Sequence, residues 1–217
     1  MRACLTSDHG VLSQRYSQDW IKTFVELFKA RAVATNERGF QEWNTLSGSN
    51  DHDFFVELLA QIGFTNEFGT PIIMSLKLRS NHMQPHCDYP LTDNFGSPYK
   101  SYLIPLNNFG SSSTVLFNQR SKDIMGQDAL DNIVERFPVL PDDENACALS
   151  TLEHVSNAVL RRLSVKKVLP WSPNSILFWD SDLLHCSCAY DQKFGASRDA
   201  VIIWTVKNQS MQEEKNV

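Results

Sequence analysis

The sequence predicts a mainly β domain with supporting helices, of the α+β class, whose strands form a sandwich or a small barrel. Two helical patterns come first, and short apolar segments bounded by Gly, Pro, Asn and Asp dominate from Pro71 onward. The chain has 217 residues, of which 42% are hydrophobic, which is enough for one substantial core but short for two. We therefore expect a single domain over residues 1–217.

Residues 1–66 are expected to form the helical support. Apolar side chains from Trp20 to Phe28 recur at helical spacing and predict an amphipathic helix over 17–32. A second apolar pattern predicts a helix that begins at Asp51 and ends near the glycine at position 63. The segment 36–49 is polar and contains glycine, which is typical of a loop.

The strands of the core are expected in two blocks, 71–118 and 164–208. Apolar runs between turn residues predict strands at 71–78, 99–106, 114–117, 164–171, 175–179, 183–188 and 200–207.

Residues 120–163 interrupt this succession of strands as a helical insertion. The segments 128–137 and 149–160 have helical patterns, and an acidic, proline-bracketed loop lies between them at 138–145. An insertion of this size between strands is uncommon without a role, so we regard it as a candidate lid over a site.

Charge and cysteine content narrow the class of protein. The formal net charge of −5 argues against nucleic acid or an anionic membrane as a general partner. No stretch approaches the ~18 continuous apolar residues of a transmembrane helix, and the N-terminus lacks the apolar segment of a signal peptide. The five cysteines are an odd number without a paired framework, which suits a reducing compartment. The cytoplasm is therefore the expected location.

Two distant segments carry a candidate metal site. His86 and Asp88 are two residues apart on an extended segment, so their side chains point to the same side. His185 follows an apolar strand and a polar turn far downstream, so the sheet has to bring it to the first pair. Two imidazoles and one carboxylate are the ligand set of non-heme Fe(II), with zinc as the competing metal.

Arg198 precedes the last apolar strand and adds a carboxylate-binding group. A guanidinium can hold a carboxylate through two parallel hydrogen bonds, which a zinc site alone would not need. Arg198 shares one side of the strand with Ala200, Ile202 and Trp204. Both sides of the strand are apolar, so the alternation does not tell which side is interior.

These motifs resemble the Fe(II)/2-oxoglutarate-dependent oxygenase superfamily. The matching pieces are His86-Cys87-Asp88, the segment 174–180 leading into Leu183-Leu184-His185, and then Arg198, within a likeness that covers 72–207. The resemblance implies a double-stranded β-helix, or jelly roll, with helices packed on one side. It also implies that His86, Asp88 and His185 bind iron and that Arg198 pairs with the distal carboxylate of 2-oxoglutarate.

The resemblance bears on three further details. Tyr102 stands where members often carry a hydroxyl donor that binds the co-substrate. Many members read Arg-x-Ser after the second histidine, whereas this chain reads Arg198-Asp199-Ala200, which lacks the second hydroxyl. The aspartate at position 88 favours hydroxylation over halogenation, because halogenases of the family lack that carboxylate.

The activity that the resemblance implies is hydroxylation of a C–H bond in a small polar molecule or a peptide side chain. Fe(II) would be the cofactor, with dioxygen and 2-oxoglutarate as co-substrates, and 2-oxoglutarate would be decarboxylated to succinate. The alternative is a non-catalytic, cupin-like jelly-roll module that binds a metal or a carboxylate. A structural sandwich of the phage or capsid type is a third and weaker alternative. The residues do not specify the substrate or the oligomeric state.

Overall fold

The computed structural model describes residues 7–13, 16–31, 40–46, 50–79, 84–89, 95–107, 112–121, 150–161, 163–188 and 198–208. The helix expected at 128–137 and the loop expected at 138–145 lie outside these ranges. No helix within them is long and apolar enough to cross a membrane.

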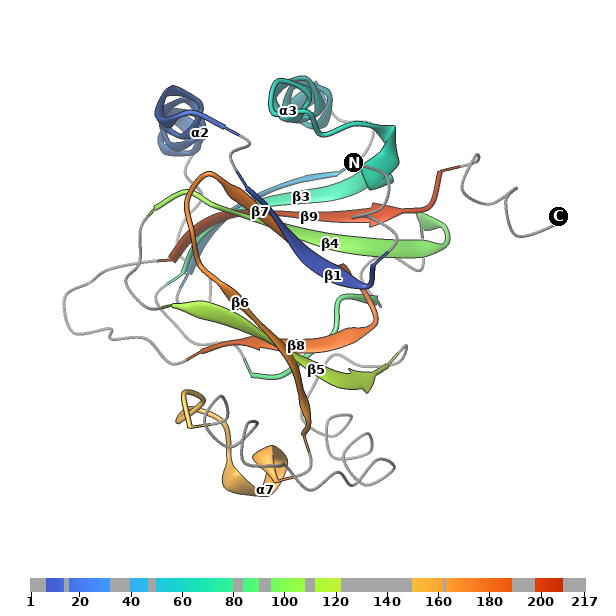
Figure 1. The fold of residues 1–217 in the computed structure, drawn as a ribbon. Coiled ribbons are helices and arrows are strands. Elements are labelled where there is room, and N and C mark those ends of the chain that lie inside the picture. The colour runs from blue at the N-terminus through green and yellow to red at the C-terminus, as the bar shows by residue number, and fades with distance from the viewer. Residues whose placement is uncertain are drawn as a thin grey trace, which may run out of the picture.

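Two antiparallel sheets face each other and form the core of the described fold (Figure 1). The larger has the strand order β1-β7-β4-β9-β3-β2 and the smaller the order β6-β5-β8, so the chain passes repeatedly between the sheets after β4. The strands are β1 (His9–Ser13), β2 (Phe40–Leu46), β3 (Thr70–Arg79), β4 (Pro98–Pro105), β5 (Ser113–Arg120), β6 (Val165–Pro170), β7 (Ser175–Asp180), β8 (Leu183–Ser187) and β9 (Arg198–Val206). The expected mainly β class and jelly-roll core are confirmed.

Two helices cover the outer face of the larger sheet, α2 (Gln18–Arg31) and α3 (Asn50–Ala60) (Figure 1). The helix α2 begins where Ser17 Oγ accepts a hydrogen bond of 3.2 Å from Trp20 N, which satisfies one of the donors of the first turn. Trp20 Nε1 donates to Leu58 O at 3.0 Å and so ties the two helices together. After α3 the chain turns at Gly63, whose φ of 75° is readily adopted only by glycine. A short helix, η1 (Asn66–Phe68), then leads into β3.

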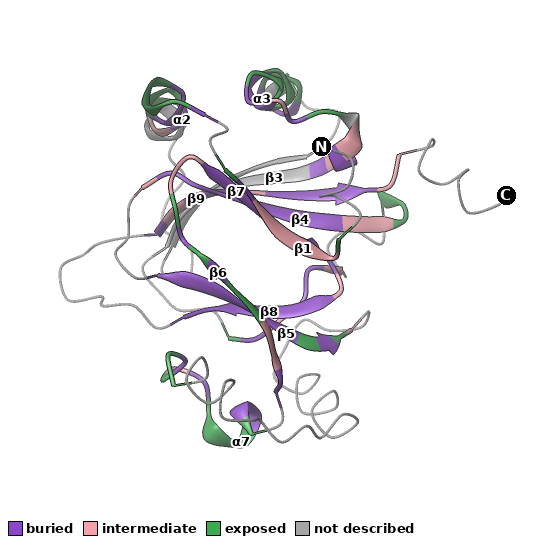
Figure 2. Ribbon diagram, viewed as in Figure 1, coloured by how far each residue is buried: buried purple, intermediate pink, exposed green. Residues whose placement is uncertain are grey.

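Three buried clusters fill the spaces between the layers, and Figure 2 shows the buried residues along the facing strands. The first lies between the helices and the larger sheet and includes Phe24 and Phe55. The second lies between the two sheets and includes Leu177 and Trp179. The third lies beyond the smaller sheet, where Val159 of α7 (Asn157–Leu160) packs against it. Removing this apolar surface from water is the main favourable term in folding.

Alternation along the strands decides which side chains face the space between the sheets. On β7, Phe178 belongs to the cluster beneath the helices and Trp179 to the cluster between the sheets. On β8, Cys186 belongs to the cluster against α7, so its neighbour His185 faces the opposite way, toward the larger sheet.

Residues 1–66 supply strands as well as helices, which corrects the expectation of purely helical support. The short strand β1 pairs with β7, and β2 pairs with β3 at the other end of the larger sheet. The expected loop at 36–49 was therefore wrong for its central half, which β2 occupies. An edge strand has one partner and tolerates polar residues, so the apolar alternation that marks a central strand is weak there. Of the helix expected at 149–160, only the α7 portion is helical.

Candidate metal and carboxylate site

The segment 84–89 lies beside β8 and brings the two histidines of the sequence motifs together. His86 N donates to His185 O at 3.0 Å, and His185 N donates to His86 O at 2.8 Å, as an isolated antiparallel bridge. Asp88 N donates to Ser181 O at 2.9 Å, within the turn that joins β7 to β8. The backbone of the second motif therefore holds the first motif in place.

His86, Asp88 and His185 converge on one point at the inner side of β8. Each offers one ligand atom, and these atoms lie within 4.8 Å of one another. His185 Nε2 is 3.5 Å from an oxygen of Asp88, and the centroids of the two imidazole rings are 4.3 Å apart. Asp88 and His185 are 4% and 5% exposed, respectively. Three ligand atoms this close can bind a single cation.

Backbone carbonyls orient both imidazoles. His86 Nδ1 is 2.8 Å from Gln84 O, and His185 Nδ1 is 3.0 Å from Leu183 O. A carbonyl oxygen only accepts hydrogen bonds, so each Nδ1 carries a proton, and the neutral form of each ring has its lone pair on Nε2. Nε2 is therefore the atom that each histidine offers to a metal.

Asp88 is ionised although it is buried. Burial alone would raise the pKa of its carboxyl, but the positive charge that the imidazoles of His185 and His86 carry when protonated, with a smaller effect of the nearby polar groups of Ser101 and Trp204, holds that pKa below its usual range. An ionised carboxylate is the form that binds a metal.

Three side chains form a row across the inner face of the larger sheet. Ser101 of β4 pairs with Trp179 of β7 on one side and with Trp204 of β9 on the other. The ring centroid of Trp179 is 4.6 Å from that of His185. Trp179 Nε1 is buried and has no hydrogen-bond acceptor among the described residues. A buried N–H group of this kind is a donor that a ligand can use.

Arg198 is the first residue of β9 and faces the interior. Ala200, two residues along the strand, belongs to the cluster between the sheets, and Arg198 itself is only 5% exposed. Its guanidinium carbon lies 4.1 Å from the ring centroid of Trp171, as a cation stacked on an aromatic face. A guanidinium is the side-chain group best suited to bind a planar acceptor such as a carboxylate.

Tyr102 is not brought to this site, which corrects its expected role in binding the co-substrate. Its ring packs in the cluster beneath the helices, 5.0 Å from the ring of Phe64 and 5.4 Å from that of Phe68 between centroids. Its hydroxyl donates to Phe68 O at 2.9 Å, and burial raises the pKa of this hydroxyl well above its usual value. The neighbouring Ser101 faces the metal ligands instead.

The described end of the insertion lies on the outer side of the smaller sheet. Gln84 Nε2 donates to His154 O at 2.9 Å, and Cys87 packs in the same cluster as Val155 and Val159. These residues contact the segment 84–89 on the side that faces away from the larger sheet. The expected lid over the site concerns the rest of the insertion, which lies outside the described residues.

Three residues near the site had no functional assignment from the sequence. Trp204 could have been found from its alternation with Arg198 along β9, which puts both on one side of the strand. Ser101 and Trp171 carry no comparable signal, because a serine in a strand and a tryptophan at a strand end are common structural residues.

Several solved structures resemble the chain over most of its length. A prolyl-4-hydroxylase from Pseudomonas putida matches with a TM-score of 0.54 and 11% identity, covering 96% of this chain and 100% of that one. HygX from Streptomyces hygroscopicus, solved with nickel, 2-oxoglutarate and hygromycin B bound, has a TM-score of 0.53 and 11% identity, covering 92% and 82%. SnoN, a non-heme alpha ketoglutarate dependent epimerase from nogalamycin biosynthesis, has a TM-score of 0.53 and 9% identity, covering 94% and 83%.

By sequence, no protein-family model and no curated protein matches the chain. The structural likeness at these identities establishes the fold. The chain has the jelly-roll fold of the Fe(II)/2-oxoglutarate-dependent oxygenases.

Proposed function

We propose that the chain is an Fe(II)- and 2-oxoglutarate-dependent oxygenase that hydroxylates a C–H bond of a small polar molecule or a peptide side chain. The observation that carries the proposal is the convergence of His86, Asp88 and His185, whose ligand atoms lie within 4.8 Å of one another. These three ligands alone would suit iron or zinc. The buried guanidinium of Arg198, also on the inner side of the sheets, adds the group that a dicarboxylate co-substrate needs.

The donor set fits ferrous iron. Two imidazole nitrogens and one carboxylate on one side of a metal leave positions open for a bidentate co-substrate and for dioxygen. When bound, iron and 2-oxoglutarate would supply the oxidising chemistry, with succinate and carbon dioxide as by-products. Trp179 Nε1 also fits, because it is a buried donor whose acceptor is missing among the described residues and which a bound oxygen atom could satisfy.

The side chains of the protein would hold and orient the reacting groups. His86 and His185 offer Nε2 because backbone carbonyls engage Nδ1 in both rings. Asp88 contributes an ionised carboxylate, and Arg198 would fix the far carboxylate of the co-substrate. The apolar cluster between the sheets excludes water from this space, which strengthens each polar contact within it.

The fold neighbours support the proposed substrate class, and the cysteines support the proposed location. The fold neighbours are described as a prolyl-4-hydroxylase, as a protein with hygromycin B bound and as an enzyme of nogalamycin biosynthesis, so the fold accommodates peptide residues and small molecules. Cys87, Cys186 and Cys188 are buried and form no disulfide, which supports a reducing compartment such as the cytoplasm.

An anaerobic titration of the metal-free protein with Fe(II) and 2-oxoglutarate tests the proposal. The visible charge-transfer absorption of the iron–2-oxoglutarate chelate should develop in the wild type and be lost in His185→Ala. Arg198→Ala should need far more 2-oxoglutarate to reach the same absorption. His52→Ala is the matched control, because His52 lies on α3, on the outer side of the larger sheet, where its Nε2 is 3.1 Å from Pro71 O, and this variant should titrate like the wild type.

Succinate formation in air, screened across pools of metabolites and peptides, would then identify the substrate class. No absorption at saturating metal and co-substrate would contradict the oxygenase proposal. The better account would then be the non-catalytic module, in which the same side chains bind another metal or a carboxylate ligand.

A further inference from the structure

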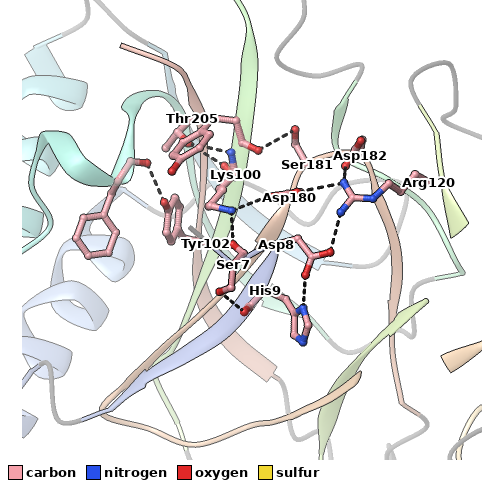
Figure 3. A network of polar contacts seen from close by, with 12 residues as sticks. Ser7, Asp8, His9, Lys100, Tyr102, Arg120, Asp180, Ser181, Asp182 and Thr205 are labelled. Atoms are coloured by element: carbon pink, nitrogen blue, oxygen red, sulfur yellow. Dashed lines mark hydrogen bonds and ion pairs between the residues drawn. The ribbon is translucent and has the colours of Figure 1, made fainter. Parts of the chain in front are cut away.

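Charged side chains gather where β7 ends and the chain crosses to β8, as Figure 3 shows for most of them. Three are acidic and three are basic, and they come from both sheets, from the turn between β7 and β8 and from the residue before β1. We call them the charge cluster: Asp8, Lys100, Arg120, Lys166, Asp180 and Asp182.

Arg120, the last residue of β5, contacts all three carboxylates of the cluster. Its Nη1 lies 3.1 Å from an oxygen of Asp180 and 2.5 Å from one of Asp182, while its Nη2 lies 2.8 Å from one of Asp8. Arg120 therefore connects the smaller sheet to the end of β7 in the larger sheet and to the start of β1 (Figure 3). Within the described residues, the other two cations of the cluster each contact one carboxylate, Lys100 that of Asp180 and Lys166 that of Asp8.

The turn that Arg120 binds is also the turn that supports the candidate metal ligands. Ser181, between the two aspartates, accepts the backbone hydrogen bond of 2.9 Å from Asp88 N. The same turn leads directly into β8, which carries His185. Ser121 N donates to Asp182 O at 2.8 Å, so the backbone after Arg120 also joins the turn.

The two aspartates of the turn require a cation between them. Burial raises the pKa of Asp182, the charge of Asp180 raises it further, and the guanidinium of Arg120 opposes both effects. Without Arg120, the two carboxylates would repel each other across a two-residue turn, because Lys100 reaches only Asp180. The expected response is a shift of the turn, and Ser181 O and the Asp88 backbone would move with it.

We propose that Arg120 is a positioning residue for the metal ligands, acting through the turn 180–182 on Asp88 and His185. This inference rests on the proposed metal site and extends it to a side chain that touches none of the ligands. A purely structural ion-pair network is the competing account, in which the loss of Arg120 lowers stability and leaves metal affinity unchanged.

Metal affinity measured beside stability separates the two accounts. We expect Arg120→Ala to weaken binding of Fe(II), or of Mn²⁺ as a probe stable in air, by about tenfold, the lower end of what loss of an outer support costs. Lys166→Ala is the matched control, since it removes an ion pair of the same cluster, 2.9 Å long, that does not touch the turn. It should lower the thermal midpoint without changing the metal dissociation constant.

Two further variants keep the test decisive if Arg120→Ala folds poorly. Arg120→Lys retains the charge and should recover part of the lost affinity. Asp182→Asn added to Arg120→Ala removes the repulsion between the two carboxylates, so it should also recover part of the lost affinity. Circular dichroism of each metal-free variant establishes that it is folded.

The possible results have distinct meanings. Wild-type protein that binds neither Fe(II) nor Mn²⁺ would overturn the proposed function itself. Wild-type protein that binds metal, with Arg120→Ala binding it equally well, would overturn only the positioning role. Weaker binding in Arg120→Ala, partly recovered in Arg120→Lys and in the double variant, with Lys166→Ala unchanged, is the result that the inference predicts.

Discussion

Replacing Tyr102 by phenylalanine should lower the stability of the protein without weakening metal or 2-oxoglutarate binding. The hydroxyl donates to Phe68 O at 2.9 Å, and the residue is 0% exposed. Its removal takes a hydrogen bond from a buried carbonyl, at a cost of about 1–2 kcal/mol in the free energy of unfolding. For a domain of this size, such a loss corresponds to a fall in Tm of about 2–8 °C.

Ser101→Ala is the natural comparison, because the two residues are adjacent on β4 and face opposite ways. This change removes a buried hydroxyl that favours the ionised form of Asp88, so we expect metal affinity to fall by about tenfold with little change in Tm. Stability would be measured by thermal and urea unfolding of the metal-free proteins, and ligand affinity by the anaerobic titration. The pair should therefore separate stability from ligand binding.

One result would refute this assignment of the two faces of β4. A Tyr102→Phe protein that keeps its Tm but needs about tenfold more 2-oxoglutarate would mean that the hydroxyl binds the co-substrate. The role implied by the family resemblance would then be right, and the packing of Tyr102 beneath the helices would be wrong.

Three other changes test separate features of the structure. Trp179→Phe removes the buried Nε1 donor and should weaken 2-oxoglutarate binding by about fivefold, from a hydrogen bond of ~1 kcal/mol, in the same titration; equal affinity would mean that no ligand atom meets this group. Burial alone would raise the pKa of Asp8, but its contacts, led by that with Lys166, lower it from 3.8 to about 2. Because folding lowers this pKa, the ionised carboxylate stabilises the fold above about pH 4, and the stabilisation is lost as the pH falls toward 2. The stability advantage of the wild type over Asp8→Asn should shrink across that range in acid unfolding, and a constant advantage would count against the ion pairs. Gly69→Ala should cost more than about 1 kcal/mol in urea unfolding, because φ is +89° and the added Cβ would lie 2.8 Å from a carbonyl oxygen of β9. Gly63→Ala, with φ of +75° and open space around the added atom, should cost less, and equal losses would mean that the close contact is relieved.

Hydrophobic periodicity predicted the elements that bury one side against the core. The helix α2 was recognisable because Trp20 and Phe24 pack beneath it, and the strands from β3 onward were recognisable from their apolar runs. The strand β2 was not, because its sequence is largely polar and its pairing with β3 depends on contacts between distant parts of the chain. When a strand with weak β propensity is stabilised by pairing with a distant strand, its own sequence does not show it.

The candidate ligands were predictable because their chemistry is visible in the residue types, whereas their supporting contacts depend on register. Asp88 and His185 could be named from a motif and an apolar strand. The pairing of β4 with β9 shifts register between Pro98 and Ser101, so the family position of the hydroxyl donor did not reveal that Tyr102 faces the helices. The stacking of Arg198 on Trp171 depends on how the two sheets meet and could not be foreseen from either segment.

The alternation of β8 also decides where the cysteines next to the candidate ligands lie. Cys186 follows a proposed iron ligand in the sequence, and Cys87 lies between the two others, yet both sulfur atoms belong to the cluster against α7. Burial raises the pKa of the Cys186 thiol, with the neighbouring Cys188 adding to the effect, so it resists becoming the thiolate that oxidants attack. In the proposed oxygenase, the peptide backbone would separate these oxidisable side chains from the reacting centre. The period of two that aims the candidate ligands inward would then also protect the two thiols from oxidation.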